Sequence, residues 1–465
     1  MKDRLSRATG RSGRFSVSRA RREAMRTTLW IVPAAMVVGA ALLFGLTYVV
    51  DRAADGGAIT LPGFVTSGSP DAARQILIAI AAAIITVAGV LFSITILVLQ
   101  LASQQFGPRM LRNFIRDLGT QFSLGAFVAT FVYSVLALGS VESAPARNFV
   151  PHASVTVSLV LTLVDLGIVI YFIHHVAASI QLTSVVSGIA GDFRHTLENL
   201  IADRTASPRA ATDRLEPSEL SERILATGVP VAARVSGFIQ AAGHRQLIGL
   251  AVSSSSVIRF VRRPGHFVVE GQTVAFVLPV EAAGEVAEAL GRAHIVGPNR
   301  TLTQDLGFGV DQLVEVAIRA LSSAVNDTFT ALNCIDWLGD CLCHAAAVRL
   351  PDGIHRDAHG HARIIEPVIT MERLVKGATD KIRQAGSGMP AVLIRQLENL
   401  GKLRRAVSSN DLGEVIEHHA RLVLRAGDET VREEADRVDI RAAFDLVMSN
   451  VVLGSSVGDS WRAMV

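Results

Sequence analysis

The sequence predicts a membrane α-helical protein: four transmembrane helices, followed by a cytoplasmic α+β region with a small β-barrel or sandwich-like module and a helical bundle. Half of the 465 residues are hydrophobic and only 19% are charged, a mixture that suits a partly embedded chain. The uncharged run at residues 76–101 is longer than the hydrocarbon core of about 30 Å requires. Beyond residue 180 the chain becomes polar, with helical periodicity around one β-rich stretch.

Residues 1–26 form a basic tail. Lysine and arginine outnumber Asp3 and Glu23 there, and serine and glycine lie between them. We expect a disordered cytoplasmic segment whose charge sets the membrane topology, and no nucleic-acid partner.

Four apolar segments follow the tail, at about residues 27–50, 76–101, 122–141 and 154–176. The first is too long for the apolar region of a signal peptide and lacks a convincing cleavage site, so we expect it to remain as an anchor. Arginine gathers in the tail, in the loop after the second segment and beyond the fourth. The positive-inside rule therefore predicts a multi-pass protein of the bacterial cytoplasmic (inner) membrane with both termini cytoplasmic.

Small and polar residues form one stripe along the second segment. They recur at alternating steps of four and three, which places them on one helix face. In lipid such a face is expected to contact protein or water. The stripe consists of Ala82, Thr86, Gly89, Ser93, Ile96, Gln100 and Ser103. Our candidates for a pore lining or helix interface are Thr86, Gly89, Ser93, Gln100 and the following Gln104.

Other polar residues accompany the apolar segments. Asp165 falls near the middle of the fourth, where a carboxylate is costly. It is a candidate for ion passage or proton relay, or else a protonated side chain bonded to a Thr or Ser of a neighbouring helix. Arg109, His174 and His175 are expected at the inner membrane interface. Adjacent histidines on a helix point about 100° apart, which favours capping or headgroup contacts over one shared metal.

The cytoplasmic region begins with a helix and a polar linker at residues 181–218. Residues 219–280 form the β-rich module, with Pro264-Gly265 as a hairpin turn. This module is similar to a biotinyl/lipoyl-type sandwich barrel. Carrier domains of that type need a lysine at the exposed turn, and no lysine occurs between Lys2 and Lys376, so we expect a spacer or assembly module. Residues 281–465 are expected to be mainly helical, with a polar connection at residues 349–367.

The densest polar set of the cytoplasmic region consists of Arg300, Gln304, Asp305, Asn326 and Asp327. Arginine, carboxylates and helix N-terminal amides can hold an anion or a polar group, which favours a ligand or subunit contact. The alternative is loop capping together with an intrachain salt bridge.

Cysteine and histidine occur close together later in the chain, without the spacing of a zinc site. No Cys-x-x-Cys pair is present, and Cys341 and Cys343 fall on opposite sides of one helix. We therefore expect buried thiols, a solvated histidine-rich loop, no metal and no cofactor. No Walker A, dinucleotide, HExxH or nucleophile-elbow motif is present, so we expect no enzyme. The residues considered are Cys334, Cys341, Cys343, His344, His355, His359 and His361.

Several motifs, in order along the chain, resemble an uncharacterised family of predicted bacterial membrane proteins, labelled domain of unknown function 2254. The resemblance covers about residues 26–450 and implies the architecture without a catalytic role. Ser323 and Thr328 stand where prolines are expected, which implies a less rigid turn. The motifs are Ser93-Ile-Thr, Gln104-Gln-Phe-Gly-Pro-Arg109, Phe172-Ile-His-His175, Ser179-Ile-Gln, Arg300-Thr-Leu-Thr-Gln-Asp305, Ala320-Leu-Ser-Ser-Ala-Val-Asn-Asp327 and Thr330-Ala.

Two functions fit these observations. The first is a homo-oligomeric channel- or transporter-like assembly whose second span lines the axis. The alternative is a non-conducting, membrane-anchored sensor or scaffold whose cytoplasmic domain binds a soluble protein partner. The expected partners are thus the lipid bilayer, further copies of the chain and, in the alternative, a soluble protein.

Overall fold

The computed structural model describes residues 30–59, 62, 68–106, 117–144, 147–179, 181–205, 216–348, 350–407 and 409–449. The chain divides into two compact units, and the described residues up to Ser184 belong to one of them while those from Val185 onward belong to the other. We call them the membrane unit and the C-terminal unit. The basic tail and Arg109 lie outside the described residues.

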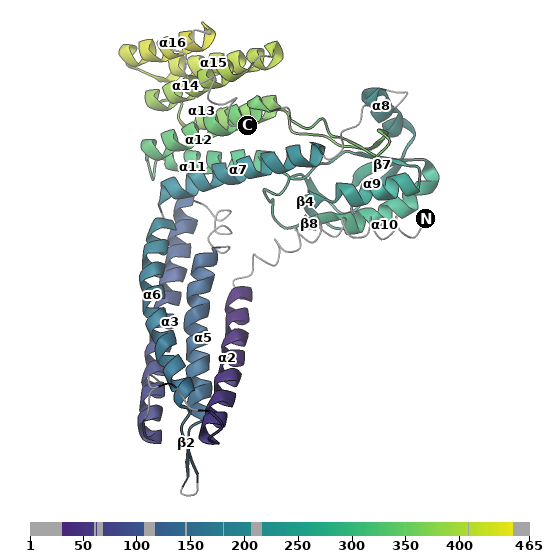
Figure 1. Cartoon of the computed structure of the whole chain (residues 1–465). Coiled ribbons are helices and arrows are strands. Elements are labelled where there is room, and N and C mark those ends of the chain that lie inside the picture. The colour runs from purple at the N-terminus through teal and green to yellow at the C-terminus, as the bar shows by residue number, and fades with distance from the viewer. Residues whose placement is uncertain are drawn as a thin grey trace. The chain divides into compact units, whose positions relative to one another are not determined.

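Four long apolar helices make up the membrane unit (Figure 1). Each is long and apolar enough to cross a membrane, as the sequence predicted. A short antiparallel hairpin joins the last two, with β1 at Glu142–Ala144 and β2 at Arg147–Phe149. The helices are α2 (Ile31–Asp55), α3 (Pro70–Phe106), α5 (Leu118–Gly139) and α6 (His152–Ser179).

Helix α5 is the centre of this unit, because it packs against α2, α3 and α6. Its buried residues include many small or hydroxylated side chains, which allow close helix approach. Tyr133 and Phe127 are completely buried on it and belong to two separate apolar clusters.

Polar contacts fix the helices of the membrane unit near one end. Asp51 of α2 accepts hydrogen bonds from the backbone N–H groups of Ala153 and Ser154, at 2.7 and 3.0 Å, and so caps the start of α6. The Ser154 hydroxyl donates to Asp51 at 2.7 Å, and the hydroxyls of Thr47 and Tyr133 lie 2.8 Å apart. These side chains tie α2, α5 and α6 together.

The C-terminal unit continues from α7 (Leu182–Thr205) into an α/β part with two sheets. The five-stranded sheet has the order β3-β7-β5-β10-β9, and the three-stranded sheet has the order β6-β4-β8. Three helices accompany them: α8 (Pro217–Thr227), α9 (His244–Ser253) and α10 (Ala283–Ala293). The strands are β3 (Val229–Ala232), β4 (Gly237–Ala242), β5 (Val257–Phe260), β6 (Phe267–Val268), β7 (Thr273–Leu278), β8 (His294–Gly297), β9 (Ile354–Arg356) and β10 (Ala362–Ile365).

The barrel or sandwich-like module expected for residues 219–280 is not confirmed by the described strands. They lie in two sheets, and β9 and β10 come from residues 349–367, where we expected only a polar connection. Strand β10 pairs in parallel with β5, and β5 pairs antiparallel with β7. Strand β6, which follows the expected hairpin turn, pairs instead with β4 of the other sheet. The chain does turn at Pro264-Gly265, where Gly265 has a φ of +92°.

Six further helices form a bundle, in the region of residues 281–465 that the sequence predicted to be mainly helical (Figure 1). Asp327 caps one of them by accepting a hydrogen bond from the Thr330 N–H at 3.0 Å, as expected. Helix α14 packs against α12, α15 and α16. The helices are α11 (Leu306–Ala320), α12 (Thr328–Ala347), α13 (Met371–Ala385), α14 (Pro390–Ala406), α15 (Asn410–Thr430) and α16 (Glu434–Met448).

Candidate functional site

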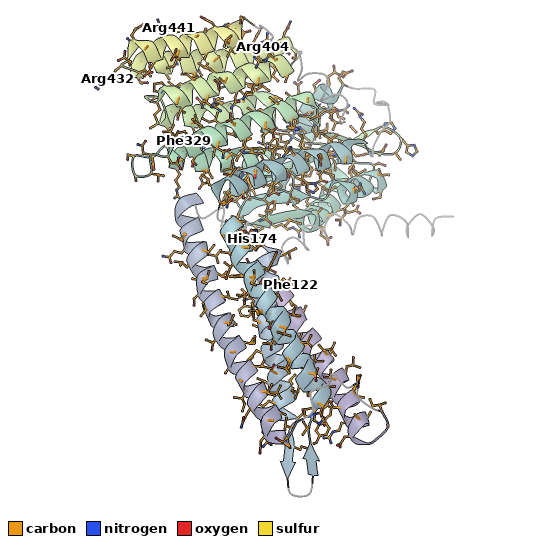
Figure 2. The ribbon with its side chains drawn as sticks, turned by 60° about the vertical axis from the view of Figure 1, so that its left-hand side comes forward. Phe122, His174, Phe329, Arg404, Arg432 and Arg441 are labelled. Atoms are coloured by element: carbon orange, nitrogen blue, oxygen red, sulfur yellow. The ribbon has the colours of Figure 1, made fainter. Side chains whose placement is uncertain are left out.

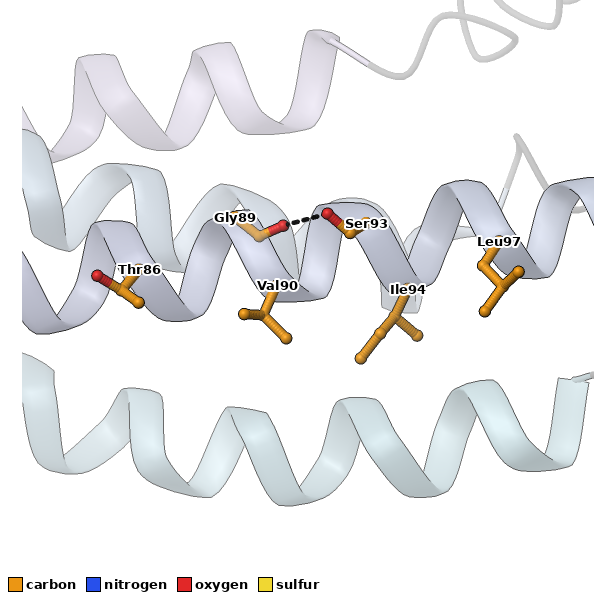
Figure 3. A pocket seen from close by; sticks show the side chains of 6 residues that line it. All are labelled: Thr86, Gly89, Val90, Ser93, Ile94 and Leu97. Atoms are coloured by element: carbon orange, nitrogen blue, oxygen red, sulfur yellow. Dashed lines mark hydrogen bonds between the residues drawn. The ribbon is translucent and has the colours of Figure 1, made fainter.

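The polar stripe of α3 lies on the outside of the bundle formed by one chain. Thr86, Gly89, Ser93 and Gln100 are exposed, whereas Leu91 on the opposite side is buried. A shallow groove runs along this face (Figure 3). It is lined by Thr86, Gly89, Val90, Ser93, Ile94 and Leu97.

Two hydroxyls of the stripe are hydrogen-bonded within α3 itself. Thr86 Oγ1 donates to the carbonyl of Ala82 at 2.7 Å. Ser93 Oγ donates to the carbonyl of Gly89 at 2.9 Å (Figure 3). These bonds reduce the cost of exposing the hydroxyls to an apolar surrounding. Thr86 and Ser93 are therefore less dependent on a polar environment than the sequence suggested. The side chain of Gln104 lies outside the described residues.

Asp165 is buried between two helices of the membrane unit, with 2% of its surface exposed. It forms a hydrogen bond with Thr130 of α5, while its Oδ2 atom has no hydrogen-bond partner among the described residues. The hydroxyls of Ser134 and Ser158 make a second contact between α5 and α6, at 2.7 Å. Asp165 thus belongs to a line of interhelical polar contacts.

The adjacent histidines of α6 have different surroundings, as their helical spacing predicted. His175 Nε2 lies 2.7 Å from Oδ2 of Asp117, the residue that caps α5 by accepting from the Thr120 N–H at 2.8 Å. His174 is exposed on α6 (Figure 2). His175 therefore fastens α6 to the start of α5, and His174 does not share this contact.

In the C-terminal unit, Arg300 and Asp305 form a buried ion pair. Asp305 is 1% exposed, and its Oδ2 atom accepts from Arg300 Nε at 2.9 Å and lies 2.7 Å from Nη2. Arg300 Nη1 also donates to Asp311 at 2.6 Å, and Arg263 approaches Asp305 Oδ1 at 3.8 Å. Gln304 bonds both backbone groups of Ala242 at the end of β4.

Positive charge dominates the surroundings of this pair. Burial, together with the charges of Arg263, Arg262, Arg373 and Arg300, lowers the pKa of His266 to about 4. Burial raises the pKa of Asp305, although Arg300 and Arg263 oppose the shift. Such a group of arginines can attract an anion, and the buried pair positions two of them.

Asn326 and Asp327 do not join this group. Arg300 and Asp305 precede α11, whereas Asn326 and Asp327 follow it, and a 15-residue helix is about 22 Å long. The residues of the predicted polar set therefore lie at two separate places in the C-terminal unit. Asp327 acts as a helix cap there, next to Phe329, whose side chain is 85% exposed (Figure 2).

The cysteines lie on α12 within the bundle. Cys334 and Cys341 are fully buried, and burial raises the pKa of each thiol to about 12. Burial raises the pKa of Cys343 to about 11. The raised pKa values favour the protonated thiols at neutral pH, and Cys334 and Cys341 are buried as the sequence predicted.

A family model described as "Predicted membrane protein (DUF2254)" matches residues 26–402. The chain belongs to the DUF2254 family. It is similar to uncharacterized proteins of Mycobacterium bovis and Mycobacterium tuberculosis, each 29% identical over 425 residues, a stretch that covers 90% of this chain and 80% of the relative. No solved structure matches the chain.

This DUF2254 protein also brings together three residues that the sequence analysis did not connect. His244, His355 and Glu366 meet beside the five-stranded sheet, although His244 and Glu366 are 122 residues apart. No local spacing indicates this cluster. Recognising β9 and β10 as a hairpin could have paired His355 with Glu366, but not with His244 at the start of α9.

Proposed function

We propose that this DUF2254 protein is a multi-pass protein of the bacterial cytoplasmic membrane, with both termini on the cytoplasmic side. The support is the distribution of arginine, which is concentrated in the tail, in the loop after α3 and beyond α6. The description of the family supports a membrane, and the mycobacterial relatives support a bacterial setting.

We further propose that the chain forms a homo-oligomeric channel- or transporter-like assembly in which α3 lines the central axis. One observation carries this proposal: the small and polar face of α3 is open on the outside of a single chain, while the opposite face packs against α5. Small residues let a second helix approach closely, and exposed Gln100 would find water or a symmetric partner there. Copies arranged around α3 would therefore surround a partly polar axis.

A second candidate is a non-conducting sensor or scaffold. The hydroxyls of Thr86 and Ser93 already bond to α3 carbonyls, so the same face can also form a dry contact between copies. The exposed side chains of Val325 and Phe329 in the C-terminal unit would suit a soluble protein partner.

Cross-linking tests the interface that both candidates share. Ser93→Cys should give disulfide-linked dimers in membranes under mild oxidation, because Ser93 would face its copy. Leu163→Cys is the matched control, since Leu163 is 70% exposed on α6. The wild type reports on any background from the native cysteines. Equal dimer formation by both variants would remove the proposal that α3 forms the interface.

Ion flux into proteoliposomes separates the channel from the scaffold. Wild-type protein should conduct, and Ser93→Leu and Gln100→Leu should reduce the flux at least about tenfold, because each removes a polar group from the axis. No flux, or unchanged flux in both variants, would exclude the channel. Cross-linking at position 93 without flux would instead support the scaffold.

A further inference from the structure

Three side chains from separate segments converge in the α/β part of the C-terminal unit. His244 Nε2 lies 3.0 Å from Glu366 Oε2, and His355 Nε2 lies 2.8 Å from Glu366 Oε1. The two imidazole rings are stacked, with centroids 4.0 Å apart. One atom from each residue can be chosen so that all three lie within 4.8 Å of one another.

The fold explains why the three residues meet. His355 pairs with Ile364 across the β9–β10 hairpin, and Glu366 comes directly after β10, two residues beyond Ile364. Because side chains alternate along a strand, Ile364 and Glu366 face the same side as His355. The Glu366 N–H donates to the carbonyl of Gly353 at 2.9 Å and extends this pairing. Helix α9 packs on β9 and β10, which brings its first residue, His244, to the same place.

We propose that His244, His355 and Glu366 bind one divalent transition-metal ion, with Zn²⁺ as the best fit. Two imidazoles and one carboxylate are a ligand set that Zn²⁺ uses when a fourth position is left for water or another ligand. Bonds of about 2.0–2.2 Å in tetrahedral geometry separate neighbouring ligand atoms by roughly 3.4 Å. The two histidines contact different oxygens of Glu366, and the three ligand atoms, one from each residue, lie within 4.8 Å of one another. Side-chain shifts of up to about 1.4 Å would bring them to that spacing.

The type and exposure of the ligands narrow the choice of ion. Imidazole nitrogen favours Zn²⁺ and its transition-metal neighbours over Mg²⁺ and Ca²⁺, which prefer oxygen. The side chains of His244, His355 and Glu366 are 15%, 25% and 11% exposed, so an ion can enter without unfolding the unit. A bound ion would join the start of α9 to the β9–β10 hairpin and thereby secure the edge of the sheet.

Zinc binding to the purified full-length protein tests this proposal. After treatment with a chelator, the protein is dialysed against Zn²⁺, and bound metal is measured by elemental analysis and by competition with a chromophoric chelator. The wild type should bind one ion per chain. His355→Ala and Glu366→Gln should each weaken binding by at least about 100-fold, because each removes a ligand.

His359→Ala is the matched control, since the His359 side chain is exposed on the same turn between β9 and β10. It should bind Zn²⁺ like the wild type. Circular dichroism checks that the variants fold, and Glu366→Gln keeps the size of the side chain if His355→Ala does not fold. The visible spectrum of Co²⁺-loaded wild-type protein gives an independent readout of tetrahedral coordination. Absence of Zn²⁺ binding by the wild type, or equal binding by all variants, would overturn the proposal. His244, His355 and Glu366 would then be a hydrogen-bonded cluster that binds no metal.

Discussion

Gly265 packs its α-carbon against the carboxylate of Asp305, so closely that a methyl group on it would overlap both carboxylate oxygens. Its φ is +92°, and its N–H donates to the carbonyl of Ile239 at 2.8 Å. The turn after β5 is thereby held against the residue that precedes α11. A single glycine thus connects the α/β part of the C-terminal unit to the ion pair at the start of the bundle.

Gly265→Ala should lower the free energy of unfolding of the C-terminal unit. The left-handed backbone costs about 1 kcal/mol for a residue with a side chain, and the overlap with Asp305 adds roughly 1–3 kcal/mol. Gly271→Ala is the matched control, since Gly271 has a φ of +82° and open space where the methyl group would lie. Thermal unfolding followed by circular dichroism should show the larger loss for Gly265→Ala. Equal losses would contradict the close contact.

Asp305→Asn should be far more destabilising than Asp311→Asn, although both carboxylates bond Arg300. Asp305 is buried, and removing one partner of a buried ion pair costs about 3–5 kcal/mol. Asp311 is 32% exposed, and a pair at such a site contributes about 1 kcal/mol or less. Denaturant unfolding monitored by tryptophan fluorescence compares the two variants. A greater loss for Asp311→Asn would show that the buried pair does not stabilise the unit.

Asp51→Ala should loosen α6 from α2 in the membrane unit. The carboxylate accepts three hydrogen bonds at the start of α6, and the loss of such a cap costs about 1–2 kcal/mol. Asp55→Ala, one helical turn later on α2 and exposed, should have little effect. Titration of the detergent-solubilised protein with SDS, followed by helicity, measures the difference. Similar midpoints for Asp51→Ala and the wild type would refute the capping role.

The cysteines should react slowly with iodoacetamide in the folded protein. A thiol with a pKa of about 11, as at Cys343, has a thiolate population at neutral pH roughly 300-fold below that of a free thiol with a pKa of about 8.5. Because the pKa is raised, the reaction should accelerate as the pH rises toward that value. Mass spectrometry of the three cysteine peptides gives the rates, with denatured protein as the control. Rapid labelling of folded protein at pH 7 would contradict the burial.

The four membrane helices and most helices of the bundle could be predicted because their signals are local. Length and lack of charge indicate a membrane span, and Asp327 followed by an apolar run indicates a helix start. Membrane spans and helix starts depend on residues that are close together in the sequence, so they can be predicted from the sequence directly.

The topology of the sheets and the histidine–glutamate cluster depend on contacts between distant residues. Strand β10 has only four residues, and Arg363 interrupts its apolar pattern, so residues 349–367 resembled a loop. Periodicity predicted that the small and polar residues of α3 share one face, but it could not show that α5 would pack on the opposite face. Helix pairing is a property of two segments, whereas periodicity describes one.

The parallel pairing of β5 with β10 has a consequence for biosynthesis. The ribosome completes β5 well before residues 362–365 emerge. One edge of β5 therefore has no paired strand while α11 and α12 are synthesised. An unpaired strand edge can recruit a strand from another chain. A truncated chain that ends before residue 349 would keep this edge permanently open, and aggregation of such fragments is the expected fate.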